Sequence, residues 1–516
     1  MPRARISTYT APPAAVVSAL DDLRAAHDVP AVFPQDALRE ARAAAAAWDD
    51  DGAERFLRDG HGDGVPVRDA RDLPLVTIDP PGSMDLDQAV LLEHPAGGGY
   101  RVTYAIASLA TFITPGGALD AELRRRGETV YAPDRSTPLH PEELSHGAAS
   151  LLPDVDRPAC LWTIDLDDDG AVTSAHVERA LVRSHARLTY AEVQAAIDGQ
   201  GTLPAAVPAG LPGLLREVGT LRQRQEAARG GVSLSTPEQE VTRTDEPGAD
   251  GYRLAYRAAL PVEEWNAQVS LLTGMCAARL MVEAGAGVLR TMPPAEARDY
   301  RRLRRIARAL GVDWPETLTY PGLVRSLDAS VPAHAAFMDQ AAGLFRGAGY
   351  LVFGPGCGPA PSADGEAVHA AIASRYAHVT APLRRLVDRY GEEACVAACA
   401  GAPVPAWVLE ALPGLPDVMA ETGRRSRAVE RGAVSAIEAL VLDGHVGEVF
   451  DGVLLSERDG RGEVMLAEPA VVGVVHADEA SAGGAHGRAL PVGEPVRVRL
   501  EEVDVAAGRI AFALVP

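Results

Sequence analysis

The sequence contains no lysine, so all 49 of its side-chain cations other than histidine are arginines. Aromatic residues make up only 5% of the chain. The net charge is −22, because 71 acidic residues outnumber the arginines. So acidic a chain is not a general binder of nucleic acid over its whole surface, although arginines gathered in one channel would still hold a strand.

The sequence also has few cysteines and no long apolar run. Its five cysteines form no CxxC pair, which predicts free thiols and no zinc site. No apolar stretch approaches the ~20 residues that span a bilayer, and the first residues lack the apolar core of a signal peptide. With 516 residues, of which 47% are apolar and 23% charged, we expect a folded cytoplasmic protein of two to four domains that does not bind membranes. The sequence leaves the oligomeric state open, and we favour a monomer.

The most informative segment is an acidic turn that follows an apolar run ending at Ile78. Asp79, Asp85 and Asp87 lie close together, and a Pro-Pro-Gly turn separates the first from the other two. Because clustered carboxylate oxygens suit hard divalent ions, these residues are candidate metal ligands. Asp85 and Asp87 are two positions apart, so an extended chain points them the same way. Taken alone, the segment is also compatible with a turn whose carboxylates only bond nearby backbone.

A second informative segment lies far downstream, at residues 376–388. It combines an aromatic ring, an imidazole, a hydroxyl and two guanidiniums: Tyr376, His378, Thr380, Arg384 and Arg385. Pro382 predicts a loop around Thr380, after which Arg384 and Arg385 would open a helix. A guanidinium bonds two phosphate oxygens at once, so these arginines are candidate phosphate ligands. The alternative is a helix start with its arginines on a solvated face.

Together the two segments resemble the ribonuclease II and ribonuclease R family, whose catalytic unit is the RNB domain. The spacing Asp79-x5-Asp85-x-Asp87 is similar to the catalytic signature of that family, and residues 376–388 resemble its Y-x-H-x-T-S-P-I-R-R-Y-x-D motif. Further segments resemble family motifs in the same order, at residues 127–141, 150–158, 186–190 and 427–431. Several motifs in register are a stronger signal than any one of them.

The resemblance implies an enzyme, a 3′-to-5′ exoribonuclease that hydrolyses single-stranded RNA to nucleoside 5′-monophosphates. It implies a Mg²⁺ cofactor, with Mn²⁺ as a substitute, held by Asp79, Asp85 and Asp87. It places Asp85, Asp87 and Arg384 in the catalytic set, with Arg384 on the scissile phosphate. It assigns RNA contacts to Tyr131, Tyr190, Tyr376, His378, Thr380, Arg385 and Glu430.

The sequence departs from the family pattern at several motif positions. Gln88 stands where the family has a fourth aspartate, so a metal site would have one neutral oxygen ligand in place of a charge. Ser108 replaces the aspartate of an I-A-D triplet, and Ala381 and Leu386 replace the usual Ser and Tyr. These departures indicate a divergent branch. They leave open a second function, a catalytically weak RNA-binding or regulatory relative with an impaired metal site.

The chain is predicted to form an α+β fold in three parts. Residues 1–70 form a helical segment with helices at about 13–27 and 35–58, too short for the cold-shock domains that usually precede the catalytic domain. Residues 71–443 form a mixed RNB catalytic domain, a central sheet surrounded by helices. Five short strands between glycine turns in residues 444–516 predict a small closed barrel of the OB type. It resembles the family's RNA-binding domain, although only Phe450 and Phe512 are available to stack on bases.

Outside the motif segments, arginines gather at residues 301–308 and 424–431. Leu303, Ile306 and Leu310 recur at helical spacing in the first cluster, which predicts a solvated amphipathic helix. The second cluster lies close to the motif residues in the family pattern, and there we expect contact with RNA.

Overall fold

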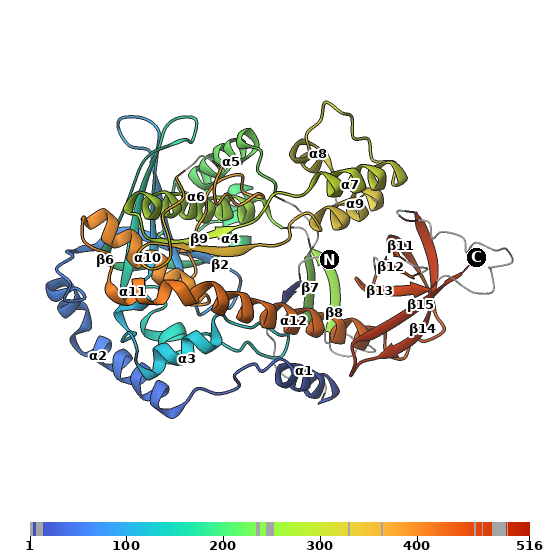
Figure 1. Ribbon diagram of the computed structural model, residues 1–516, viewed down its shortest axis with the longest axis horizontal. Coiled ribbons are helices and arrows are strands. Elements are labelled where there is room, and N and C mark those ends of the chain that lie inside the picture. Colours follow the sequence, from blue (N-terminus) through green and yellow to red (C-terminus); the bar gives the residue numbers. More distant parts are fainter. Residues whose placement is uncertain are drawn as a thin grey trace.

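The computed structural model describes residues 4–6, 14–233, 238–243, 252–257, 259–328, 331–362, 365–458, 461–466, 468–476, 492 and 494–515. The fold is α+β, with a large body at one end and a small barrel at the other (Figure 1). The long helix α12 (Leu415–Leu442) runs from the body toward the barrel and connects the two (Figure 1).

Two N-terminal helices appear where the sequence predicts them, α1 (Ala14–Ala26) and α2 (Gln35–Asp59). Helix α1 packs along α12, where Val16 and Leu20 share a buried cluster with Ile437. Helix α2 covers the body through Trp48, whose indole N–H donates to the backbone carbonyl of Asp156 at 3.2 Å. The short strand β1 (Ala4–Ile6), which was not predicted, pairs with β7 (Glu238–Arg243), and β7 pairs with β8 (Tyr252–Arg257).

The predicted central sheet closes into a five-stranded barrel. Its strands are β2 (Val67–Asp79), β3 (Gln88–Glu93), β4 (Tyr100–Ala107), β5 (Asp156–Leu166) and β6 (Val172–Thr189), in that order, with β6 pairing parallel to β2. Successive residues of a strand face opposite sides, so Ala89 and Leu91 join one buried cluster while Val90 and Leu92 join another. Burial on both faces explains why β3 and β4 are apolar over most of their length, whereas the first residues of β2 and β6 are more exposed and more polar.

Helices cover this barrel and carry the rest of the body. They are α3 (Ala118–Arg126), α4 (Tyr190–Ile197), α5 (Leu211–Arg229), α6 (Pro261–Ala284), α10 (Leu386–Ala400) and α11 (Ala406–Ala411), with the short turns η1 (Leu109–Thr111), η2 (Glu143–Ala148) and η3 (Leu412–Gly414). The sequence predicts a central sheet surrounded by helices over residues 71–443. The sequence analysis missed the β7–β8 hairpin and the antiparallel pair β9 (Gly287–Thr291) and β10 (Gly349–Phe353).

Three helices inserted between β9 and β10 form a separate small group: α7 (Ala297–Ala309), α8 (Tyr320–Ser326) and α9 (Pro332–Ala342). They have their own core, which includes Leu303 and Phe337. Arg301, Arg305 and Arg308 are exposed on α7. The predicted solvated amphipathic helix is therefore confirmed.

The C-terminal barrel forms from the five predicted strands, β11 (Val449–Arg458), β12 (Arg461–Leu466), β13 (Val472–His476), β14 (Pro495–Asp504) and β15 (Arg509–Val515). They close in the order β11-β12-β13-β15-β14. Phe512 is fully buried, so only the partly exposed Phe450 is left as an aromatic at the barrel surface. Among the helices in the described residues, none combines the length and apolar character needed to cross a membrane.

Candidate active site

The acidic segment connects β2 to β3 and is anchored from behind. Asp79 ends β2, and a turn with Gly82 in the left-handed region (φ +81°) follows it. The side chain of Leu86 is fully buried, and its backbone N–H donates to Ser150 Oγ at 3.0 Å. Because neighbouring side chains of extended chain face opposite ways, burying Leu86 turns Asp85 and Asp87 together toward the other side.

The downstream segment forms a tight loop before α10. Its expected helix start is wrong by two residues, because Arg385 is extended and α10 begins at Leu386. The carboxylate of Asp388 accepts the N–H of Ala381 at 2.7 Å and also bonds the guanidinium of Arg385. On the other side, buried His140 donates through Nδ1 to the carbonyl of Leu383 at 2.9 Å. Burial lowers the pKa of His140 to about 3, which keeps this ring neutral.

The two segments meet at Asp87. Its Oδ1 accepts the backbone N–H of Leu383 at 2.7 Å, although the two residues are 296 positions apart. The Nε of Arg384 lies 3.6 Å from Asp87 Oδ2, and about half of the Arg384 side chain remains exposed. A buried carboxylate and a partly exposed guanidinium thus lie side by side where the two segments meet.

Asp87 and Arg384 line a cavity of about 650 Å³. The cavity wall is built by the β2–β3 turn, the segment 129–138 after α3, η2, the start of α4, the loop before α10 and one residue of α12. Eight of the predicted site residues line it: Asp79, Asp85, Asp87, Gln88, Tyr131, Tyr190, Arg384 and Glu430. Tyr190 is the first residue of α4, after a capping box in which Thr189 and Glu192 bond each other's backbone N–H.

The charge of this cavity favours a cation. Burial raises the pKa of Asp79 to about 7, and the neighbouring charge of Asp85 adds to the shift while Arg384 opposes it. Burial also raises the pKa of Asp87 well above its usual range. Arg384 and Arg187, which both oppose the shift at Asp79, therefore do not compensate three carboxylates. Such a set of hard oxygen donors suits Mg²⁺.

The three carboxylates are not gathered tightly. Within the described part of the chain, the group whose ligand atoms all lie within 4.8 Å of one another is His61, Asp63 and Glu393, not the acidic turn. In that group the guanidinium of Arg179 already bonds both acids. The carboxylates of the cavity are more widely spread.

Gln88 is held at both ends of its amide. Its Oε1 accepts the hydroxyl hydrogen of Tyr104 at 2.5 Å, and its Nε2 donates to the backbone carbonyl of Thr380. The amide thereby ties β3 to the loop before α10. An aspartate here would supply neither the reach nor the N–H donor. That Gln88 is a metal ligand stays a prediction.

Four predicted RNA contacts do not line the cavity: Tyr376, His378, Thr380 and Arg385. Their side chains lie on the side of the loop that faces away from the cavity, where they hold the loop in place. The ring of His378 bonds the hydroxyl of Tyr350 at 2.7 Å and meets Tyr376 edge to face. Arg385 is engaged by Asp388, and Thr380 is buried with its carbonyl bonded by Gln88. Sequence reasoning put these residues at the cavity because it had no means to tell the front of the loop from its back.

Other cavity residues were missed by the sequence analysis. Ser145 and His146 reach the wall from η2, a short π-helix, a geometry that occurs often at functional sites. Arg187 stabilises the acidic turn by donating to the carbonyl of Ser83 at 3.2 Å. The Ser-His pair begins four residues after the Pro138-Leu-His-Pro segment, so the sequence offered a signal for it. Arg187 is recognisable only from the turn that it bonds.

Comparison with known sequences and structures matches most of the chain. The sequence profile of the RNB domain matches residues 67–396, and that of the RNase II-type exonuclease C-terminal S1 domain matches residues 448–515. Ribonuclease R of Escherichia coli is 27% identical over 484 residues, which cover 87% of this chain. The chain spans only 57% of the length of that relative.

Solved structures share the fold. Mycoplasma genitalium RNase R, in complex with ribose methylated single-stranded RNA, has a TM-score of 0.83 at 18% identity, covering 97% of this chain and 78% of that one. Yeast Ssd1, described as a pseudonuclease, has a TM-score of 0.62 at 14% identity, covering 80% of this chain and 50% of that one. The shared fold therefore does not by itself decide between activity and its loss.

Proposed function

The chain belongs to the RNB-domain family of ribonucleases II and R, and on that premise we propose that it is a 3′-to-5′ exoribonuclease. Its substrate is single-stranded RNA and its products are nucleoside 5′-monophosphates. The observation that carries the proposal is the meeting of Asp87 with Leu383 and Arg384 in one acidic cavity. Neither motif alone forms that cavity.

In this proposal Asp79, Asp85 and Asp87 hold Mg²⁺, which Mn²⁺ replaces. When bound there, the metal supplies Lewis acidity toward phosphate oxygens and water. The raised pKa of Asp79 means that a proton competes for the same oxygens below about pH 7. Activity should therefore rise as the pH increases through that value, because the carboxylate must be free to bind.

The protein groups have separable tasks. Arg384 binds the non-bridging oxygens of the scissile phosphate, for which its exposed half is free while Asp87 orients its Nε side. Tyr131 and Tyr190 are partly exposed in the cavity wall and stack on the terminal nucleotides. Stacking tolerates any base, as a sequence-independent exonuclease requires. The C-terminal barrel lacks a row of aromatics, so it contributes little stacking.

The proposal is tested with one single-stranded RNA carrying a label at either the 3′ or the 5′ end. With Mg²⁺, the 3′ label should be released at once as mononucleotide, while the 5′ label stays on progressively shorter RNA. EDTA and the variant Asp87→Asn should each abolish release. Release of the 5′ label first, or cleavage that persists in Asp87→Asn, would refute the assignment.

A second function is favoured by one observation, the tied amide of Gln88 where the family has a fourth aspartate. In this alternative the chain is a catalytically weak RNA-binding or regulatory relative. It predicts that wild type binds the same RNA yet releases no mononucleotide with Mg²⁺ or Mn²⁺. The labelled-RNA assay therefore separates the two functions directly.

A further inference from the structure

A second hollow lies on α12, outside the acidic cavity. It measures about 530 Å³ and lies between one side of α12 and the end of α1. Its lining comprises Ala26, His27, Asp28, Glu421, Arg424, Arg425, Arg427, Ala428 and Arg431. It contains no phenylalanine, tyrosine or tryptophan, so charge and hydrogen bonds must account for any binding there.

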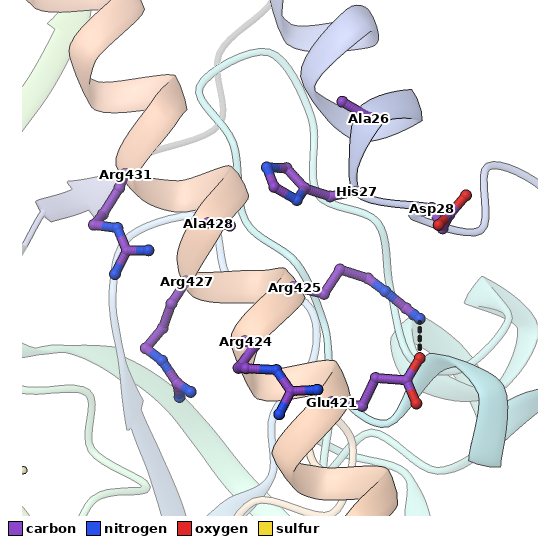
Figure 2. Close-up of a pocket in the computed structure, with 9 residues that line it drawn as sticks. All are labelled: Ala26, His27, Asp28, Glu421, Arg424, Arg425, Arg427, Ala428 and Arg431. Carbon is purple, nitrogen blue, oxygen red and sulfur yellow. Dashed lines mark hydrogen bonds and ion pairs between the residues drawn. The ribbon is translucent and has the colours of Figure 1, made fainter. Parts of the chain in front are cut away.

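Three of its arginines are exposed: Arg424, Arg427 and Arg431, called here the α12 arginine face. Across the described part of the chain, no ion pair or hydrogen bond is recorded for any of them, and Arg427 and Arg431 leave the same side of the helix (Figure 2). Arg425 differs, since it pairs with Glu421 at 3.5 Å and donates to the carbonyl of Arg125 at 3.0 Å.

The α12 arginines differ from other exposed arginines, such as those of α7, because they line a hollow on the helix that also reaches the acidic cavity. The net charge is −22, and acidic partners are abundant for any exposed cation. Glu128 lies near Arg427, and Glu430 lies near Arg427 and Arg431, but in the described part of the chain neither acid forms an ion pair with them. An anionic ligand would therefore meet guanidinium donors that are not already bonded. The three span about 10 Å along the helix axis, at 1.5 Å per residue. That is an extended track of charge, longer than a single small anion covers.

The arginine face adjoins the acidic cavity through the same helix. Glu430, one residue before Arg431, lines the cavity. Arg427 lies near Glu128, which is half-buried. Glu128 also lies near Arg385, in the loop before α10. A strand leaving the cavity along α12 therefore reaches the arginine face within two helical turns.

We propose that the α12 arginine face binds the sugar–phosphate backbone of single-stranded RNA, on the 5′ side of the terminus held in the cavity. This inference rests on the proposed function, because it assumes that the cavity takes the 3′ end. Guanidiniums suit phosphodiester oxygens, and the lack of aromatic rings makes the contact independent of sequence. The last residue of α1, Ala26, and the two residues after it, His27 and Asp28, form the opposite wall of the hollow and border the path of the strand.

The test measures how RNA binding depends on salt. Each phosphate contact to a single strand contributes about 0.7 to the slope of log affinity against log salt concentration. The triple variant R424Q/R427Q/R431Q should therefore lower the slope by about 2. Between 50 and 200 mM salt, the affinity of the triple variant should therefore fall about 20-fold less than the affinity of wild type does. Binding is measured in EDTA with a long RNA, which prevents metal-dependent hydrolysis.

The matched control is R301Q/R305Q/R308Q, which removes three exposed arginines from α7 and the same total charge. Its slope should match wild type. If both triple variants lower the slope equally, overall charge attracts RNA and the proposal is refuted. Each single arginine variant should lower the slope by about 0.7, which checks the triple result on less altered proteins.

Two further measurements distinguish failure of this inference from failure of the proposed function. Inorganic phosphate should show no saturable binding; saturable binding that the triple variant loses would overturn the proposal in favour of a small-anion site. If wild type releases mononucleotides but the α12 triple variant keeps the wild-type slope, the inference fails and the proposed function stands. If wild type neither binds nor degrades RNA, both fail together.

Discussion

Asp79 gives the sharpest test of the electrostatics of the cavity. Its carboxyl has a pKa of about 7 in the folded protein, against an ordinary value of 3.8. In the unfolded chain the group is ionised above about pH 4, whereas in the fold it stays protonated up to about pH 7. Between these values the unfolded state has released a proton that the folded state retains, so stability falls as the pH rises.

The size of this loss follows from the shift. One pKa unit corresponds to about 1.4 kcal/mol, so the full window is about 4 kcal/mol and the part between pH 5 and 7 is about 3 kcal/mol. Asp79 is partly exposed at the cavity wall, and screening by solvent reduces the latter figure to about 2 kcal/mol. The variant Asp79→Asn cannot ionise. The free energy of unfolding of the variant, measured relative to that of wild type, should therefore increase by about 2 kcal/mol when the pH is raised from 5 to 8.

The assay is denaturant unfolding of the metal-free protein at both pH values, with EDTA present. Comparing the variant with wild type at two pH values removes any fixed cost of the substitution. The control is Asp165→Asn, because Arg101 lowers the pKa of Asp165 and this carboxyl stays ionised in both states throughout. A difference between Asp79→Asn and wild type that is the same at pH 5 and pH 8 would refute the reasoning.

Three further predictions concern the cavity. Arg384→Ala should lower kcat on the order of 100- to 1000-fold, as loss of a transition-state donor does, whereas Arg301→Ala on the surface of α7 should leave kcat unchanged; a rise in KM alone would contradict this role. Tyr131→Ala should raise KM for RNA by about 5- to 150-fold, the equivalent of about 1–3 kcal/mol of stacking, with Tyr131→Phe keeping most of the affinity; equal losses would contradict stacking. Gln88→Asp should lower the free energy of unfolding by about 1–3 kcal/mol, because it leaves the carbonyl of Thr380 without its donor, and unchanged denaturation would show that the amide is not holding the loop.

Local pattern predicted the elements well. Alternation and glycine turns were enough for the five C-terminal strands, and helical spacing was enough for α1 and α2. Short-range geometry also placed Asp85 and Asp87 on one side of Leu86. These features depend on residues near one another in the chain, so their spacing carries the information. The β7–β8 hairpin was missed because its pairing gives little local signal within a largely helical region.

The sequence by itself determined the chemistry that the chain carries, namely the carboxylates, arginines and tyrosines and the family to which their order belongs. Only the tertiary structure decided how they meet. The backbone N–H of Leu383 meets Asp87 across 296 residues, while His378 bonds Tyr350 and Thr380 bonds Gln88 away from the cavity. Spacing fixes directions only within one element. Convergence of distant segments depends on the packing of every element between them.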